Sequence, residues 1–227
     1  MLTTKSEFER RLKEINLYFD ALAPLDDCSC FIESQTINGE TKRTPIDSEL
    51  NKILKANGFI LMYNLLEATI RNTIRAIGDK ISDEGLKYQD FSDNLKRLWI
   101  NHTFKDSDKQ TDKHKFISPI LHKIVNNEFL KFEEESVSIS GNIDAKKVRE
   151  IAKRIGYKEP KDGADLLVIK EKRNQLAHGE KTFGEIGRDI SVKQLIEMKN
   201  AMMSFIEEVL DNVQEYIDNK NYCQPVG

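Results

Sequence analysis

The chain is short of several residue types, and each shortage narrows what the protein can be. Its 227 residues include only five prolines, eleven glycines and three cysteines. A small and odd number of cysteines does not fit a secreted domain held by disulfides and is typical of reduced thiols in a cytosol. We therefore expect a cytoplasmic protein.

Long hydrophobic runs and a large excess of one charge are also missing. The most apolar stretch, around residues 58–66, is about half of the roughly 20 residues that a membrane-spanning helix needs. No basic segment followed by an apolar one opens the chain, so we expect no secretory signal and no membrane segment. The 35 basic and 38 acidic residues give a net charge of −3, which excludes a uniformly polybasic coat protein but allows a local basic face.

Motifs for metals and nucleotides are absent from the sequence. Cys28 and Cys30 are separated by one residue, too few for the usual zinc clip, and no His-Glu-x-x-His pattern occurs. No Walker loop or Gly-x-Gly-x-x-Gly is present, and no histidine stands near a cysteine to activate it. We predict no metal and no cofactor, and the roles of Cys28 and Cys30 stay open.

Apolar residues recur mostly at helical spacing, which predicts an all-α protein. The capping-box pattern Ser6-x-x-Glu9 opens a first helix, and Pro24 closes it. Ser118-Pro119 is typical of an N-cap followed by proline in the first turn, and predicts that a helix begins there. Further helices are expected over residues 47–81, 91–101, 144–156, 164–177 and 192–219.

The segment between the first two predicted helices has no helical period. Its Asn38-Gly39 pair is a tight-turn signal and predicts a small hairpin or irregular insert. We predict a single domain over residues 1–227, in which residues 1–46 hold an N-terminal helix and this insert. We expect residues 47–222 to form a helical bundle.

The segment from Lys170 to Gly179 carries the densest group of chemically useful side chains. Asn174 and His178 are four residues apart and lie on nearly the same helix face, whereas Arg173 and His178 are roughly 140° apart around the axis. Gly179 is expected to end the helix, which places His178 at the negative end of the helix dipole. An imidazole there is suited to acid–base catalysis. The alternative is a histidine that only caps the helix, beside an exposed arginine.

Arg173-Asn-Gln-Leu-Ala-His178 resembles the Arg-x(4–6)-His motif of the HEPN superfamily, including the polar residue after the arginine. The upstream apolar helix with Tyr63-Asn-Leu-Leu-Glu67-Ala-Thr-Ile-Arg71 and the long helix after the motif are similar to the HEPN four-helix core. Ser140-Gly-Asn-Ile-Asp144, followed by a basic helix, resembles bacterial HEPN-like nucleases encoded beside defence and toxin–antitoxin genes. The resemblance covers roughly residues 50–222.

The resemblance implies a metal-independent endoribonuclease with Arg173, Asn174 and His178 as catalytic residues. RNA supplies its own nucleophile, the 2′-hydroxyl, so the enzyme needs a proton acceptor, a proton donor and a cation. The resemblance also implies a homodimer with a composite active site, because a two-fold axis through the motif brings two copies together. Glu67 and Arg71 form either an intrahelical ion pair or a pair that positions Arg173 or His178.

Local charge predicts where RNA binds. Residues 146–173 hold ten basic and five acidic residues, a local net charge of +5, whereas the chain from residue 201 onward carries −4. We predict that Lys147, Arg154, Lys170 and Lys172 contact phosphates. An ordinary solvated helix face is the alternative interpretation.

Two other functions stay open. The bundle is either a catalytically silent HEPN module that binds nucleotides or proteins, or an antitoxin-type partner that a nucleotidyltransferase modifies at Tyr216 or Tyr222. A neutralising antitoxin or another defence-locus protein is a further candidate partner. We expect a role as a toxin or phage-defence effector, and the RNA target cannot be derived from these residues.

Overall fold

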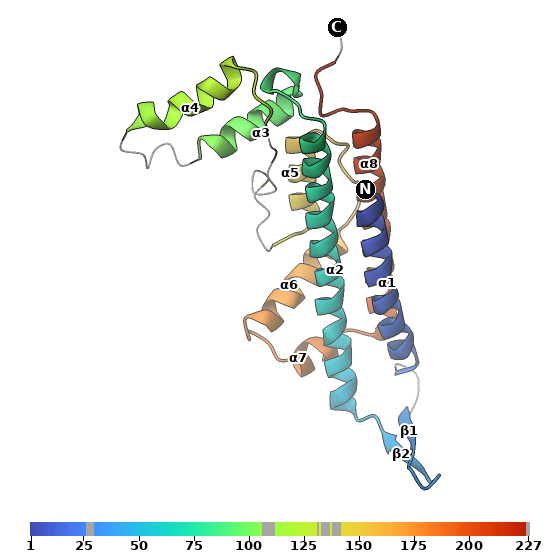
Figure 1. The fold of residues 1–227 in the computed structure, drawn as a ribbon. Coiled ribbons are helices and arrows are strands. Elements are labelled where there is room, and N and C mark those ends of the chain that lie inside the picture. The colour runs from blue at the N-terminus through green and yellow to red at the C-terminus, as the bar shows by residue number, and fades with distance from the viewer. Residues whose placement is uncertain (26–29, 106–111, 131, 133–136, 138–141, 226–227) are drawn as a thin grey trace. The chain divides into compact units, whose positions relative to one another are not determined.

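The computed structural model describes residues 1–25, 30–105, 112–130, 132, 137 and 142–225. Within these residues the chain forms eight α-helices and one small sheet, which confirms the predicted all-α class (Figure 1). The helices are α1 (Leu2–Leu22), α2 (Ser48–Asp83), α3 (Asp93–Thr103), α4 (Lys113–Val125), α5 (Ala145–Ile155), α6 (Asp165–Ala177), α7 (Phe183–Arg188) and α8 (Val192–Asp218), with short 3-10 helices at Ala23–Leu25 and Tyr88–Asp90. No described helix combines the length and the hydropathy needed to cross a bilayer.

The predicted insert is an antiparallel hairpin. β1 (Phe31–Gln35) pairs with β2 (Thr41–Pro45). Gly39 in the connecting turn has a φ of 81°, in the left-handed region that glycine adopts at little cost, and its N–H donates to the Thr36 carbonyl at 2.9 Å. Every residue of both strands is exposed, so the hairpin adds nothing to the core.

Residue contacts divide the chain into two compact units. Unit 1 comprises Met1–Lys5, Ala68–Asp162 and Phe205–Gly227, and unit 2 comprises Ser6–Glu67 and Gly163–Ser204. Both α2 and α8 therefore supply residues to each unit. A single domain over residues 1–227 stays a prediction.

Unit 2 packs the first part of α2 against α1, α6, α7 and the start of α8. A Cβ at Gly58 of α2 would lie 3.4 Å from the Phe19 ring and 3.8 Å from Leu195, so this glycine marks a close approach of three helices. A Cβ at Gly187 of α7 would lie only 1.9 Å from the Lys52 carbonyl oxygen, so α7 and α2 meet backbone to backbone. The core between these helices includes Phe8, Ile15, Phe19, Phe59, Met62, Tyr63, Leu66, Leu166, Ile169, Ile186, Leu195 and Met202.

Unit 1 is built around the amphipathic helix α5. The Asp144 carboxylate caps its start by accepting from the Lys147 backbone N–H at 2.9 Å, and Gly156 ends it with a φ of 104°. The buried face of α5 consists of Ala145, Val148, Ile151, Ala152 and Ile155. Tyr216 of α8 donates its hydroxyl to the Ile155 carbonyl at 3.1 Å, so α5 and the end of α8 share one core.

Two predicted helix starts differ from the structure. α1 begins at Leu2, before the Ser6 pattern. α4 begins at Lys113, and Pro119 lies inside it, because Asp112 caps the helix upstream by accepting from the Lys115 N–H at 3.2 Å. The predicted start at Ser118 is therefore wrong.

The short helix α7 lies between residues 177 and 192, a segment in which no helix is predicted from the sequence. Thr182 and Glu185 form a capping box at its start, in which each side chain accepts from the other residue's backbone N–H. This Thr-x-x-Glu pattern is visible in the sequence and could have revealed the helix. Of the segment that resembles other HEPN-like nucleases, Ser140 and Gly141 lie outside the described residues.

Candidate active site

The end of α6 fixes the position of His178. The Glu180 N–H donates to the Gln175 carbonyl at 2.9 Å and the Gly179 N–H donates to the Leu176 carbonyl at 3.2 Å, the two hydrogen bonds of a Schellman motif. Gly179 has a φ of 68°, which makes this reversal of the chain inexpensive. His178 is the C-cap, so the predicted end of the helix is observed.

Arg173 lies against α2 within unit 2. Its guanidinium carbon is 4.4 Å from the centre of the Tyr63 ring, the geometry of a cation–π contact. Its Nη2 atom is 3.8 Å from the Glu67 carboxylate, and its Nη1 donates to the Asn174 side-chain oxygen at 2.9 Å. The arginine side chain keeps 27% of its surface exposed, so these contacts hold the guanidinium and still leave it open to a ligand.

Tyr63 contacts Arg173 in the candidate site, and the sequence-based prediction does not include it. Its side chain is fully buried, and its ring faces Arg173, the arginine of the motif. Tyr63 and Glu67 are four residues apart, so one face of α2 presents both to Arg173. The spacing of Tyr63 and Glu67 indicated that they share a face of the helix, but the sequence did not indicate which other helix packs against that face.

His178 is exposed, and its imidazole forms no hydrogen bond or ion pair with any described residue. Its backbone N–H donates to the Asn174 carbonyl at 2.9 Å. The structure therefore brings together Arg173, Asn174 and Glu67 and adds Tyr63, whereas no contact joins Arg173 to His178 within one chain's described residues.

The other predicted residues divide between the two units. Lys170 and Lys172 lie half-buried on α6 in unit 2, with the motif. Arg71 belongs to unit 1, as do Lys147, which pairs with Glu150 at 3.7 Å, and Arg154, which donates to the Val137 carbonyl at 2.9 Å. Their roles beside the motif stay predictions.

No cluster of three or more histidine, cysteine, aspartate or glutamate residues with the arrangement of a metal site occurs in the part of the chain that the structure describes. Cys28 lies outside the described residues, and the Cys30 thiol donates to the Pro24 carbonyl at 3.1 Å.

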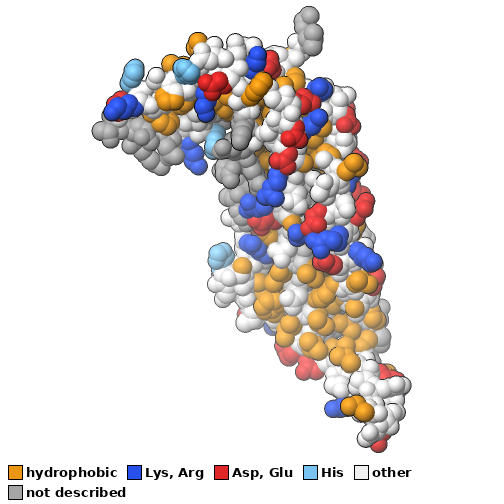
Figure 2. Space-filling view, viewed as in Figure 1, with side chains coloured by type: hydrophobic (Ala, Val, Ile, Leu, Met, Phe, Trp, Pro, Cys, Tyr) orange, Lys and Arg blue, Asp and Glu red, His pale blue; other side chains and the backbone are white. Residues whose placement is uncertain are grey.

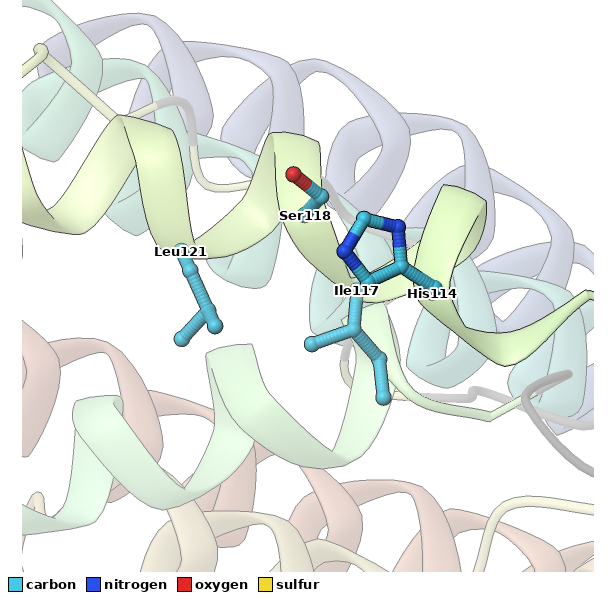
Figure 3. A pocket seen from close by; sticks show the side chains of 4 residues that line it. All are labelled: His114, Ile117, Ser118 and Leu121. Atoms are coloured by element: carbon cyan, nitrogen blue, oxygen red, sulfur yellow. The ribbon is translucent and has the colours of Figure 1, made fainter.

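A hollow of about 250 Å³ runs along α4 in unit 1, lined by His114, Ile117, Ser118 and Leu121 (Figure 3). Ile117 and Leu121 extend to the same side of the helix, and no hydrogen bond joins His114 to Ser118. Among its described lining residues, no nucleophile is paired with a base.

Unit 2 also exposes large apolar side chains. Leu17 is 63% exposed, Ile53 40% and Leu50 39%. In Figure 2, hydrophobic side chains gather next to the hairpin, over α1 and the first part of α2. Apolar surface of this kind is typical of contact surfaces.

The comparisons with known proteins agree with the all-α fold. A family model described as HEPN_MAE_28990-like HEPN matches residues 3–222, so the match includes α1 and the hairpin, which the resemblance seen in the sequence did not cover. No curated protein and no solved structure matches the chain. HEPN proteins are often ribonucleases and often dimerise and bind RNA, which suggests a nuclease or RNA-related role. With nearly its whole length matched and an all-α fold, the chain belongs to the HEPN superfamily.

Proposed function

We propose that this protein is a metal-independent endoribonuclease whose catalytic residues are Arg173, Asn174 and His178. The observation that carries the proposal is the set of contacts that hold the Arg173 side chain in place. Tyr63, Glu67 and Asn174 hold its guanidinium, which stays partly exposed at the end of α6. A preorganised cation of this kind stabilises developing negative charge without reorganising during the reaction.

The proposed reaction is an intramolecular attack by RNA on its own backbone. An imidazole accepts the proton of a ribose 2′-hydroxyl, and the 2′-oxygen forms a bond to the adjacent phosphorus. The bond from phosphorus to the 5′-oxygen of the next nucleotide breaks, and that oxygen takes a proton from an imidazolium. The products are a 2′,3′-cyclic phosphate and a 5′-hydroxyl, so no water and no redox partner enters this step.

Each motif residue has a distinct role in this scheme. His178 transfers protons, and its exposure at the C-cap leaves it accessible to a substrate. Arg173 donates two hydrogen bonds to the phosphorane oxygens. Asn174 accepts from Arg173 and so orients the guanidinium, with Glu67 as a positioning residue behind it.

The proposal includes a homodimer with a composite site. One imidazole per chain must otherwise serve as both base and acid, and no contact joins Arg173 to His178 within the described residues of one chain. An isologous dimer with the motif at its axis supplies both groups from two chains. The exposed Leu17, Leu50 and Ile53 lie in the same unit as the motif and support a contact surface there.

The direct test is cleavage of a labelled RNA by purified protein in EDTA. His178→Ala should lower the rate by at least about 100-fold, as expected for the loss of general acid–base catalysis. His114→Ala removes another exposed histidine, on α4, and should leave the rate unchanged. Full activity of His178→Ala, or equal cleavage of RNA and of an oligonucleotide lacking 2′-hydroxyls, would contradict the assignment.

The second candidate is a HEPN module that binds without cleaving. The absence of a partner for the His178 imidazole among the described residues favours it, because catalytic histidines are usually oriented by a second group. RNA that is bound but never cut in this assay would select the binding module. Burial weighs against modification of an antitoxin-type partner at Tyr216 or Tyr222, because these side chains are 1% and 0% exposed.

The proposed cellular role is that of a toxin or defence effector, neutralised by a partner encoded nearby. Expression of the wild-type chain in a bacterium should then slow growth, whereas His178→Ala at equal protein level should not. A growth defect that persists in the variant would separate toxicity from RNA cleavage.

A further inference from the structure

A second cavity, of about 320 Å³, lies between α3 and α5 in unit 1. Its volume is in the range of about 300–1,000 Å³ that small-ligand sites occupy. Its lining consists of Asn94, Arg97, Leu98, Asn101, Lys153 and Arg154. None of these residues belongs to the Arg173–His178 motif, which lies in unit 2.

The lining is strongly cationic. The described lining residues provide three basic side chains and two amides, and none of these described residues carries a carboxylate. Arg97 and Lys153 are exposed, and neither forms an ion pair with any described residue. Two cations that share a cavity attract an anion, and amide N–H groups add hydrogen-bond donors.

The cavity is held in shape by contacts between the two helices. Asn94, Arg97 and Asn101 follow the spacing that places residues on one face of α3. The Asn94 side chain donates to the Lys153 carbonyl at 3.4 Å, and a Cβ at Gly156 would lie 2.7 Å from its Nδ2 atom. Gly156 therefore leaves room for Asn94 at the junction.

The helix dipole explains only part of this charge. Lys153 and Arg154 lie in the last turn of α5, where cations offset the partial negative charge of the carbonyl end. Arg97 lies in the middle of α3 and gains no such interaction. A separate reason is needed for a third cation on the same cavity.

We infer that this cavity binds a backbone phosphate of an RNA strand, at a site separate from the catalytic motif. The choice of RNA rests on the proposed function. The lining favours a strand over a free nucleotide, because its described residues include no aromatic side chain on which a base could stack and no carboxylate to read a base edge. Contacts of this type position RNA and do not select its sequence.

The test measures RNA binding in the His178→Ala background, so that cleavage does not change the ligand. Fluorescence anisotropy of a labelled single-stranded RNA over a range of salt concentrations gives the slope of log K against log [salt]. Arg97→Gln and Lys153→Gln should each weaken binding and reduce the slope by about 0.7, the value for one phosphate contact on a single strand. The loss of binding affinity in each variant should be the same for RNAs of different sequence.

Lys123→Gln is the matched control. Lys123 is exposed in the last turn of α4, as Lys153 is in α5, so the two substitutions remove the same charge from the same kind of helix end. Lys123→Gln should leave affinity and slope unchanged. Thermal unfolding of each variant shows whether the protein is folded.

Unchanged affinity and slope in both cavity variants would overturn the inference, and so would an equal loss in Lys123→Gln. Displacement of the RNA by AMP at equal concentration, with the effect abolished by Arg97→Gln, would instead assign the cavity to a free nucleotide. Failure of the proposed function is a different result: the wild-type chain would bind RNA through Arg97 and Lys153 without cutting it.

Discussion

At the scale of single residues, Arg173 has the most constrained setting of the predicted catalytic group. The guanidinium has an aromatic face on one side, a carboxylate at 3.8 Å and an amide oxygen at 2.9 Å. Its position is thus set by groups from two helices, whereas that of His178 depends on the end of a single helix.

A substitution at Tyr63 tests whether the ring positions Arg173. Tyr63→Leu removes a cation–π contact worth about 0.5–2 kcal/mol, so the rate of RNA cleavage should fall roughly two- to thirty-fold. Tyr63→Phe keeps the ring face and should retain most of the activity. If both variants are folded by circular dichroism and cleave RNA equally, the ring is only part of the core.

At the scale of elements, the contact of α7 with α2 depends on one glycine. Gly187→Ala would place a Cβ 1.9 Å from the Lys52 carbonyl oxygen, so the backbones must separate. We expect a loss of about 1–3 kcal/mol in the free energy of unfolding, seen as a lower Tm.

Gly184→Ala in the same helix is the control for this prediction. Its Cβ would meet the end of the flexible Glu49 side chain at 3.3 Å and the Thr182 hydroxyl at an ordinary 4.0 Å, and alanine is the better helix former. Its Tm should stay the same or rise. Equal Tm values for the two variants would show that α7 does not approach α2 so closely.

The capping box of α7 makes the stability of the folded protein depend on pH. Hydrogen bonds from the Thr182 backbone N–H and then from its hydroxyl hold the pKa of the Glu185 carboxyl below its ordinary value. The charged Glu185 carboxylate therefore contributes its full stabilisation above the ordinary carboxyl pKa of about 4.5. This contribution is lost as the pH falls through the lower pKa that Glu185 has in the folded protein.

Glu185→Ala should consequently lower the Tm at pH 7 and make a smaller difference near pH 3. The effect is expected to be small, because the carboxylate is exposed and screened by solvent. If the difference in Tm between the wild-type chain and Glu185→Ala is the same at both pH values, the charged capping contact contributes nothing to stability.

At the scale of the whole molecule, the composite site makes a prediction about mixed chains. Arg173→Ala and His178→Ala should each be inactive alone, but an equimolar mixture should regain part of the activity after subunit exchange. A cleft in the mixed dimer keeps one guanidinium, and its single imidazole must act first as the base and then as the acid, so only part of the rate returns. RNA cleavage together with light scattering measures activity and mass. A fully active monomer, or a mixture no better than its components, would rule out a shared site.

The local rules of the chain determined most of its secondary structure. Asp144 caps the start of α5 and Gly156 ends it, Gly179 ends α6, and Asn38-Gly39 forms the turn of the hairpin. These features could be predicted because caps and tight turns depend on neighbouring residues alone. The same rules failed at Ser118, because Asp112 upstream offered a better start that continued through Pro119.

The pairing of helices was decided only in the tertiary structure. Arg173 and His178 could be named from their spacing, and their catalytic role stays a prediction. That Tyr63 faces Arg173, or that Arg97 of α3 shares a cavity with Lys153 of α5, could not be predicted, since these residues lie far apart in the chain. The physical reason is that periodicity tells which face of a helix is buried, whereas the partner of that face depends on how distant segments pack together.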